Sequence, residues 1–441
     1  MPIPTISQYA ESVCNPQGRF RTLGEPVCEH NAYGEPRLAA GGHAAVFRIM
    51  LGGRPHALKC YIRPGKRNDA LYDHLATHRF PLLYETRYLP RELYVYGMDG
   101  SGDWYDVLLT PWAEGVSLGR AVRKALHEGN GQRLAELSRN FDAMAARLLA
   151  MPWAHGDLKP ENLVVEPSGS LRLLDYDAMF IPGVPLPKHP ETGTPQFNHP
   201  ARDASFVCKA VDDYPIALLS ATLHTLAADP ALAHGTDLSD HPLFDPAALF
   251  AHRSATYTEA LTAAAKRGDA ITYRLLSLLL SPVPELQELG GIIRHAAGDG
   301  RKAAARTAPE PFVRGGVWGY ESEGTEVIPP LFDSALQFTE GIAIVELGGF
   351  RHFIDPTGRT VINGSRYDHL KPFRNGAAAV RCGTRWIHID RSGSPVEPPA
   401  TSAPQPSLRR ERQDEPRRRP STSGETKQAT TKKPIRCTTR K

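Results

Sequence analysis

Asp157, Lys159, Asn162 and Asp175 are the residues of this chain whose types and spacing best suit a chemical reaction. They lie in the segments HGDLKPEN (155–162) and LRLLDYD (171–177). Phosphoryl transfer requires a carboxylate beside the attacking hydroxyl, a cation near the transferred group and oxygen ligands for Mg²⁺. These four side chains supply all three. The alternative interpretation is a polar surface turn, but the spacing fits a site with several parts.

The elements around these residues must bring them together. The apolar runs LVV and LRLL flank the loop between Asn162 and Asp175 and predict a hairpin that makes these two residues neighbours. Helical periodicity marks the later residues 131–151 and 212–228. A strand-rich half followed by a helix-rich half predicts two lobes with a cleft between them. The expected strands of the first half lie within residues 36–50, 54–62, 93–98 and 103–112.

These segments resemble the catalytic loop and the metal-binding Asp-Phe-Gly motif of protein kinases. Further motifs follow the kinase order over nearly 300 residues. AAGGHAAV (39–46) resembles the Gly-rich phosphate loop, HALK (56–59) the Val-Ala-Ile-Lys strand and LTPWAEG (109–115) the hinge. GTPQFNHP (193–200) resembles the end of the activation segment, and Asp212 resembles the aspartate that ties the catalytic loop. The resemblance implies an α+β fold, bilobal and protein-kinase-like, with a β-rich N-lobe and a helical C-lobe. For Asp212, a helix N-cap is a second interpretation, compatible with the first.

The resemblance implies an ATP- and Mg²⁺-dependent serine/threonine protein kinase that acts on protein hydroxyls. In that role Asp157 would orient the substrate hydroxyl and accept its proton, while Lys159 stabilises the transferring group. Asn162 and Asp175 would hold the metal ions, and Lys59 would pair with the α- and β-phosphates. The implied nucleotide-binding residues are Gly41, Gly42, Val46, Ala57, Lys59 and Val164. Thr194 would bond near Asp157 and Lys159, which favours Ser/Thr substrates.

Several positions depart from the kinase pattern. Gly156 replaces the arginine that binds the phosphate of a phosphorylated activation loop in protein kinases, so we expect activity without loop phosphorylation. Asp177 stands at the glycine of Asp-Phe-Gly and would limit a flip to an inactive state. Ala201 replaces a glutamate, so a different buried contact must anchor its segment. On the helix expected over residues 65–77, Asp73 is the candidate ion-pair partner of Lys59.

Two other functions stay open. His-Gly-Asp also heads the catalytic loop of antibiotic and choline kinases, which makes a small-molecule kinase one alternative. Lys159 and the GTPQF segment (193–197) argue against it, because those enzymes usually lack both. The second alternative is a catalytically inactive pseudokinase scaffold, favoured by the departures from the motif pattern.

An internal repeat follows the proposed catalytic region. FTEGIAIV (338–345) recurs as FRNGAAAV (373–380), and Phe332-Asp333 recurs as Tyr367-Asp368, which gives a period of 35 residues in both cases. The region resembles WG-type repeats, on VWGY (317–320), FIDPTG (353–358) and HIDRSG (388–393). The resemblance implies a β-rich module that binds a protein partner or ligand; the alternative is a structural appendage without a partner.

The expected organisation is a kinase-like domain (1–298), a linker (299–315), a WG-like repeat module (316–398) and a disordered basic tail (399–441). Thr401–Lys441 holds twelve Lys/Arg and four Asp/Glu, a net charge of +8, so the rest of the chain carries 4 − 8 = −4. The tail lacks aromatic residues, so stacking on nucleic-acid bases is not supported. A solubilising extension and binding to a nucleic-acid or membrane surface both stay open for the tail, and the sequence does not support nucleic acid as a partner. Six scattered cysteines, no apolar run long enough for a bilayer and no visible signal sequence predict a cytoplasmic protein.

Overall fold

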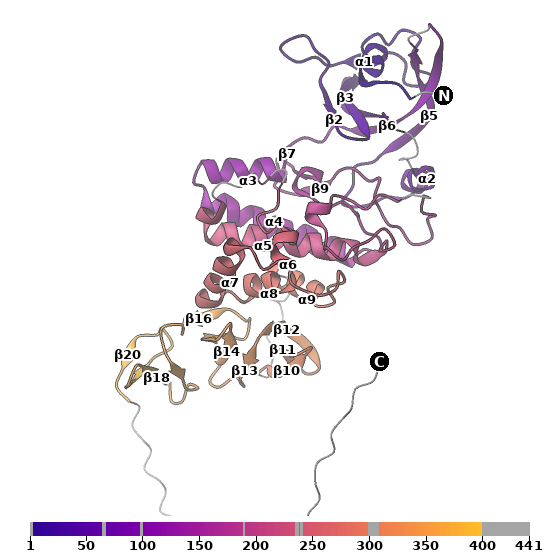
Figure 1. Cartoon of the computed structure of the whole chain (residues 1–441). Helices are drawn as coiled ribbons and strands as arrows, with labels where there is room; N and C mark the ends of the chain where they lie inside the picture. Colours follow the sequence, from indigo (N-terminus) through magenta and orange to yellow (C-terminus); the bar gives the residue numbers. More distant parts are fainter. Residues whose placement is uncertain are drawn as a thin grey trace, which may run out of the picture. The chain divides into compact units, whose positions relative to one another are not determined.

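A computed structural model describes residues 3–63, 68–97, 100–187, 190–233, 238, 241–298 and 308–398. The chain divides into two units, Met1–Pro399 and Ala400–Lys441. The expected basic tail and residues 299–307 of the expected linker lie outside the described residues. The first unit combines helix and sheet and ends in a β-rich region (Figure 1).

The N-terminal part is an antiparallel sheet that confirms the strands expected in residues 36–112. Its order is β1-β3-β4-β6-β5, with β2 paired to β3. One face of this sheet packs on helix α1 (Ile6–Cys14), burying Phe47, Ile49 and Leu58 with Tyr9 of the helix. The strands are β1 (Val27–Cys28), β2 (Leu38–Ala40), β3 (Ala44–Leu51), β4 (Arg54–Tyr61), β5 (Arg87–Tyr96) and β6 (Gly102–Pro111).

The pleat turns a second set of side chains to the opposite face of this sheet. Val46 of β3 pairs with Lys59 of β4, and Ala57 lies two residues before Lys59. Paired residues of antiparallel strands share a face, as do residues two apart on one strand. Val46, Ala57 and Lys59 therefore share the face that α1 does not cover.

Helix α2 (Asp69–Thr77) connects β4 to β5 and ends where the sequence predicts. Its N-cap is Asn68, whose side chain accepts a hydrogen bond from the Leu71 amide. Leu71, Tyr72 and Leu75 form its buried face and join the large hydrophobic core of the molecule.

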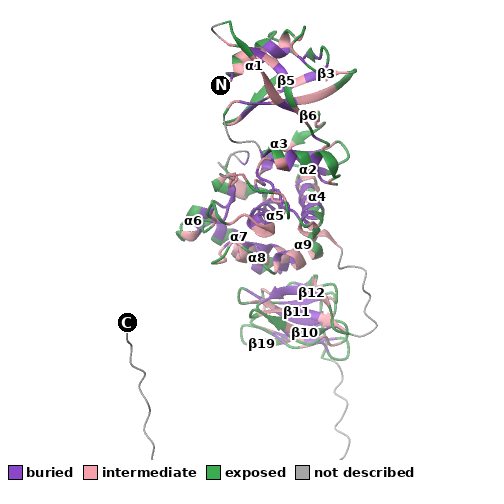
Figure 2. Cartoon of the chain, turned by 90° about the vertical axis from the view of Figure 1, so that its right-hand side faces the viewer, coloured by how far each residue is buried: buried purple, intermediate pink, exposed green. Residues whose placement is uncertain are grey.

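The middle of the chain is helical. Helix α4 (Gly131–Ala150) and helix α5 (Asp213–Ala228) confirm the two helices expected from periodicity. Helix α5 is buried along most of its length, as its purple ribbon in Figure 2 shows. An element that is apolar on nearly every side must lie inside the fold. The other helices are α3 (Leu118–His127), α6 (Pro246–Phe250), α7 (Ala255–Arg267), α8 (Ala270–Leu278) and α9 (Leu289–Ala297).

The repeats form three small antiparallel sheets, and two of them reproduce the predicted period. Strands β13 to β16 (Ser334–Ala335, Ala343–Leu347, Phe350–Ile354, Thr360–Ile362) recur after 35 residues as β17 to β20 (His369–Leu370, Ala378–Cys382, Arg385–Ile389, Pro395–Val396). Asp333 and Asp368 each accept a backbone hydrogen bond, from Gly348 at 2.7 Å and Gly383 at 2.6 Å. The repeat therefore conserves its turn contacts as well as its strands.

The first repeat sheet begins earlier than expected. Strand β10 (Glu310–Arg314) pairs with β11 (Val317–Ser322), which pairs with β12 (Thr325–Phe332). Residues 310–314 were assigned to the linker from their composition. The structure corrects this assignment, because β10 contributes its backbone hydrogen bonds to the sheet.

The repeats also pack on the helices. Ile328 and Leu331 of β12 belong to the same hydrophobic core as Ile292 of α9. His352 bonds through Nε2 to the Ala265 carbonyl at 2.8 Å. The expected division into separate kinase-like and repeat domains is therefore too sharp, since the two regions share one core. No helix in the described ranges is both long and apolar enough to cross a bilayer.

Candidate active site

A hairpin positions the centre of the site, as the sequence predicts. Strands β8 (Leu163–Val165) and β9 (Leu171–Leu173) are antiparallel, with Leu163 opposite Leu173. The Leu174 amide donates a hydrogen bond to the Asn162 carbonyl at 2.9 Å. Asn162 ends the short 3₁₀ helix Pro160–Asn162, so the hairpin holds it beside the start of the Asp175 segment.

Asp157 lies at the centre of a hydrogen-bond network. Its Oδ1 accepts the Thr194 amide at 2.6 Å, and its Oδ2 accepts Asn162 Nδ2 at 3.0 Å. Lys159 Nζ lies 3.2 Å from Asp157 Oδ2 and donates to Thr194 Oγ1 at 2.8 Å. The contacts expected of Thr194 are confirmed. Both carboxylate oxygens of Asp157 therefore accept hydrogen bonds, and a lysine lies beside one of them.

Asp212 fixes the backbone on which Asp157 stands. The fully buried carboxylate accepts the His155 amide at 2.5 Å and the Gly156 amide at 2.8 Å. Burial raises the pKa of Asp212, although His155 and the two amides oppose this effect. The tie between Asp212 and the loop is confirmed. Asp212 is also the N-cap residue of α5, as the second interpretation expects, but its side chain makes no capping hydrogen bond to the helix.

Close backbone contacts explain the glycines of this region. Gly156 has φ +84°, and a Cβ there would collide with the Ala178 carbonyl. Gly193 has φ +72°, and a Cβ there would lie 2.5 Å from the Gly156 carbonyl oxygen. Neither position can carry a side chain in this arrangement. The segment before Thr194 thus packs directly on the loop that carries Asp157.

Because Ala201 replaces a glutamate, a different buried contact was expected to anchor its segment, and the structure shows that His199 makes this contact. Its ring lies 5.0 Å from the rings of Tyr214 and Phe250, and its Nε2 bonds to the Ser281 carbonyl at 2.9 Å. The neighbouring Arg202 donates to the Gly156 carbonyl at 3.1 Å and to Asn198 Oδ1 at 2.8 Å. These contacts hold the segment to the Asp157 loop.

Lys59 joins the N-terminal sheet to this centre. Its Nζ lies 2.8 Å from Asp175 Oδ1 and 2.6 Å from Asp177 Oδ2. Burial by itself would lower the pKa of Lys59, but the two carboxylates outweigh it and raise the pKa. Burial likewise works against the ionisation of Asp175, yet Lys59 keeps the pKa of Asp175 below its usual value.

The prediction that Asp73 forms an ion pair with Lys59 is wrong. Asp73 is exposed on α2, and Asp177 pairs with Lys59 in its place. Asp175 lies at φ +62°, in the left-handed region, and its side chain is 48% exposed. Its carboxylate is therefore both paired with Lys59 and accessible to a ligand.

The nucleotide-binding residues expected from the sequence fall into two groups. Gly41 and Gly42 form the turn between β2 and β3, where open space surrounds both. Val46 and Ala57 lie on the Lys59 face of the same sheet. Val164 belongs to a different sheet, where it is buried on β8.

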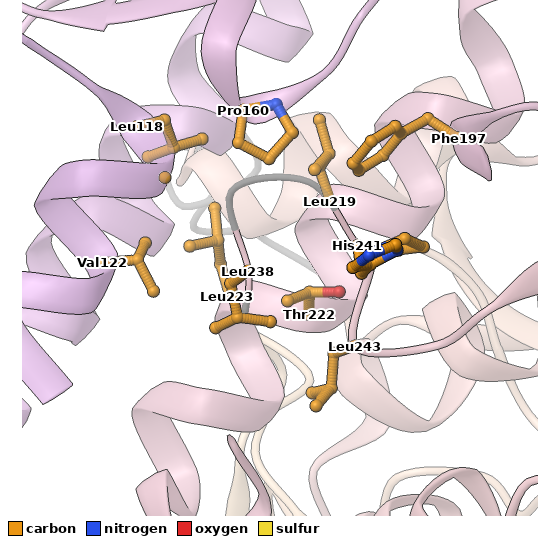
Figure 3. Close-up of a pocket in the computed structure, with 12 residues that line it drawn as sticks. Leu118, Val122, Pro160, Phe197, Leu219, Thr222, Leu223, Leu238, His241 and Leu243 are labelled. Carbon is orange, nitrogen blue, oxygen red and sulfur yellow. The ribbon is translucent and has the colours of Figure 1, made fainter. Parts of the chain in front are cut away.

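Two cavities lie beside the site. One is an apolar cavity of about 20 Å³. Figure 3 shows Leu118, Val122 and Leu223 around it, with Pro160 of the Asp157 loop at one edge. This space is large enough for about one water molecule. A more open cavity of about 630 Å³ lies between the end of α2 and Arg172 and Tyr176. Neither is lined by the acidic residues of the site.

The structure also brings together two thiols that lie far apart in the sequence. The Sγ atoms of Cys14 and Cys28 lie 2.7 Å apart, and a ligand atom of His30 lies within 4.8 Å of both. Two thiols and an imidazole could hold a metal ion such as Zn²⁺. Burial raises the pKa of Cys28 to about 12, so a metal would have to displace its proton. The wide spacing between Cys14 and Cys28 gave no motif.

Comparison with known proteins identifies one region. Residues 320–349 and 353–386 match the family model described as WG containing repeat. The match confirms the WG-type resemblance of the repeat region, and it does not extend into residues 1–319. No curated protein matches the chain.

Proposed function

We propose that this chain is an ATP- and Mg²⁺-dependent serine/threonine protein kinase, with a WG-repeat region for partner recognition or regulation. The supporting observation is one connected polar site. Asp157, Lys159 and Asn162 contact one another, and the hairpin that ends at Asn162 leads into Asp175, which pairs with Lys59. A carboxylate, a cation and oxygen ligands in one place match the needs of phosphoryl transfer.

Asp157 is the residue proposed to act on the substrate hydroxyl. Its carboxylate would accept the hydroxyl hydrogen bond, orient the oxygen towards the γ-phosphorus and take its proton as the new P–O bond forms; the bond from the γ-phosphorus to the β–γ bridging oxygen would break at the same time, and ADP would leave. Lys159, 3.2 Å from the same carboxylate, would neutralise charge on the transferring group. Thr194 fixes both side chains: its amide donates to Asp157 Oδ1 at 2.6 Å, and its Oγ1 accepts Lys159 Nζ at 2.8 Å.

The ligand set fits Mg²⁺. Asn162 uses Nδ2 as a donor to Asp157, at 2.8 Å to the carbonyl and 3.0 Å to Oδ2, which leaves its Oδ1 as a ligand atom. Asp175 offers a carboxylate that is ionised beside Lys59. Hard oxygen ligands and a small number of protein contacts suit Mg²⁺, which would neutralise phosphate charge.

The sheet face opposite α1 is the proposed nucleotide surface. Val46 and Ala57 would cover the adenine, with Val164 on its other side, and Lys59 would exchange a carboxylate contact for the α- and β-phosphates. No atom lies within 4 Å of the place that a Cβ would take on Gly41 or Gly42, which would leave room for a phosphate on that side.

Activity is proposed not to depend on phosphorylation of the segment before Thr194. Gly156 leaves no arginine to bind a phosphate there, and Arg202 already joins the segment to the loop through Asn198 and the Gly156 carbonyl. These two hydrogen bonds of Arg202 need no phosphate group. Thr192 is the one other Ser/Thr residue between Asp175 and Thr194, and Thr192→Ala should leave the rate within about twofold.

The test is transfer of label from [γ-³²P]ATP in the presence of Mg²⁺, with the full chain and a generic basic protein as acceptor. Asp157→Asn should lower the rate by about 10²–10⁴-fold while the protein stays folded under the assay conditions. Glu161→Gln is the matched control, since Glu161 is exposed on the same loop and should retain activity. Label confined to added aminoglycoside or choline would contradict the protein-kinase proposal. Nucleotide binding without transfer would instead favour a non-catalytic scaffold.

A further inference from the structure

Asp177 links Lys59 to helix α2. One oxygen of its carboxylate, Oδ2, lies 2.6 Å from Lys59 Nζ. The other, Oδ1, accepts the hydroxyl of Tyr72 at 2.5 Å and the hydroxyl of Tyr61 at 2.8 Å. Its side chain is only 8% exposed. Both oxygens of this shielded carboxylate are therefore used by protein groups.

Both phenols are held in the donating form. Burial raises the pKa of Tyr72 and of Tyr61 well above the usual value, and the negative charge of Asp177 raises both further. Neutral phenols donate hydrogen bonds to a carboxylate and stabilise its charge. The carboxylate of Asp177 therefore receives one ammonium and two hydroxyl groups.

The two tyrosines come from different elements. Tyr61 ends β4, the strand that also carries Lys59, so it moves with the lysine. Tyr72 lies on α2 and is 1% exposed, packed in the same core as Leu71 and Leu75. The hydrogen bond from Tyr61 to Asp177 ties the carboxylate to the strand that already carries Lys59. A contact through Tyr72 makes the surroundings of Lys59 depend on where α2 lies.

We propose that Asp177 and Tyr72 are positioning residues for Lys59, and that they couple the position of α2 to nucleotide use. The inference rests on the proposed function for its effect on catalysis. Asp177 directs the ammonium group, and the Tyr72 hydroxyl holds Asp177 in place only while α2 is packed against the sheet. Displacement of α2 would remove the shortest hydrogen bond to Asp177 and release Lys59 from its alignment.

The experiment compares Tyr72→Phe with Tyr61→Phe, which removes an equivalent hydroxyl from the same carboxylate oxygen. With the full chain, Tyr72→Phe should lower kcat by about tenfold or more, the effect of losing a hydrogen bond to a charged group, with little change in KM for ATP. Tyr61→Phe should change kcat by less than about threefold. Added to Asp177→Asn, Tyr72→Phe should have almost no further effect, because the phenol acts through that carboxylate.

A second measurement does not need turnover. Hydrogen exchange of the α2 peptide, residues 69–77, should slow when Mg²⁺ and a non-hydrolysable ATP analogue are added. This protection should persist in Tyr61→Phe and disappear in Tyr72→Phe. A merely structural role for Tyr72 would change the exchange rate without removing the response to nucleotide.

The possible results separate the two proposals. If wild-type protein transfers phosphate and Tyr72→Phe matches Tyr61→Phe in kcat and in nucleotide protection, the coupling through Tyr72 is refuted. If wild-type protein transfers no phosphate but nucleotide protects α2 only when the Tyr72 hydroxyl is present, the kinase proposal fails and the coupling stands. If the double variant loses the full product of both single effects, Tyr72 does not act through Asp177.

Discussion

Removal of the Asp212 carboxylate should destabilise the chain strongly. In Asp212→Ala, two fully buried amides, those of His155 and Gly156, lose acceptors at 2.5 Å and 2.8 Å. Hydrogen bonds to a charged group contribute about 1.5–3 kcal/mol each, so the two together contribute about 3–6 kcal/mol. Because burial raises the pKa of Asp212, part of this gain is offset by the cost of burying its charge. We therefore expect a loss near the lower end, about 3 kcal/mol.

The assay is urea unfolding at pH 7. With an m-value of about 3 kcal/mol/M, a loss of about 3 kcal/mol lowers the midpoint by about 1 M. Asp212→Asn keeps one acceptor but turns an amide donor towards the second backbone N–H, and its midpoint should fall between those of Asp212→Ala and wild type. A midpoint for Asp212→Ala within about 0.2 M of wild type would refute the reasoning.

Asp213→Asn is the matched control. The adjacent Asp213 accepts a single backbone bond, from Leu286 at 3.0 Å, and burial raises its pKa to about 7. Asparagine retains the acceptor without the buried charge, so Asp213→Asn should not lower the midpoint at pH 8. Since folded Asp213 keeps its proton to a higher pH than the unfolded chain, this residue destabilises the fold progressively from about pH 4 to pH 7. Asp213→Asn should remove that component of the pH dependence.

Three further changes test other parts of the structure. Gly156→Ala should lower the urea midpoint and the transfer rate more than Gly183→Ala, because both glycines have positive φ but only the first would collide with backbone. Burial opposes the protonation of His224, but Asp142, 2.7 Å away, outweighs this effect and raises the pKa of the histidine. The stabilisation that the His224–Asp142 pair gives to the fold is therefore complete below about pH 6.5 and is lost as pH rises. The difference in urea midpoint between wild type and His224→Gln should shrink from pH 6 to pH 9. Burial lowers the pKa of His352, so protonation of this residue destabilises the fold, unlike protonation of His224. His352→Gln should therefore lessen the loss of stability on acidification below about pH 6.5.

Local patterns in the sequence were sufficient to predict the centre of the site. The hairpin between Asn162 and Asp175 follows from two apolar runs separated by a turn, and such contacts involve residues near in sequence. The contacts of Thr194 with Asp157 and Lys159 came from the motif resemblance and were confirmed at 2.6 and 2.8 Å. In both cases residue type and order carried the necessary information.

The partner of Lys59 could not be found in this way, because it depends on how α2 turns in the fold. The search for an acidic residue on α2 led to Asp73, whereas Leu71, Tyr72 and Leu75 take the buried face. Side chains four apart on a helix share a face, so Leu71 and Leu75 already indicated which side faces inward. The inward polar group is a tyrosine hydroxyl, which a search for carboxylates misses.

The boundary of the repeat region was misplaced for a related reason. Composition predicted a linker up to residue 315, but Glu310–Arg314 pairs with β11 as an edge strand, where exposed side chains are normal. The packing of β12 on α9 had a signal in Leu289, Ile292 and Ile293, an apolar face at the end of the helical region. Such a face requires a cover, and the sequence does not specify which later segment supplies it.

The site combines a loop held by its own contacts with a lysine whose alignment depends on a hydroxyl from another element. Asp157 is held by backbone and by Thr194, and its loop is held by Asp212 and Arg202, all through contacts made without a modification. Lys59 is aligned by Asp177, which receives a hydroxyl from α2. Under the proposed function, regulation would therefore act on α2 and not on the loop of Asp157. A regulator of this chain should change the kcat of the wild-type protein but have little effect on Tyr72→Phe, in which the link to α2 is already absent.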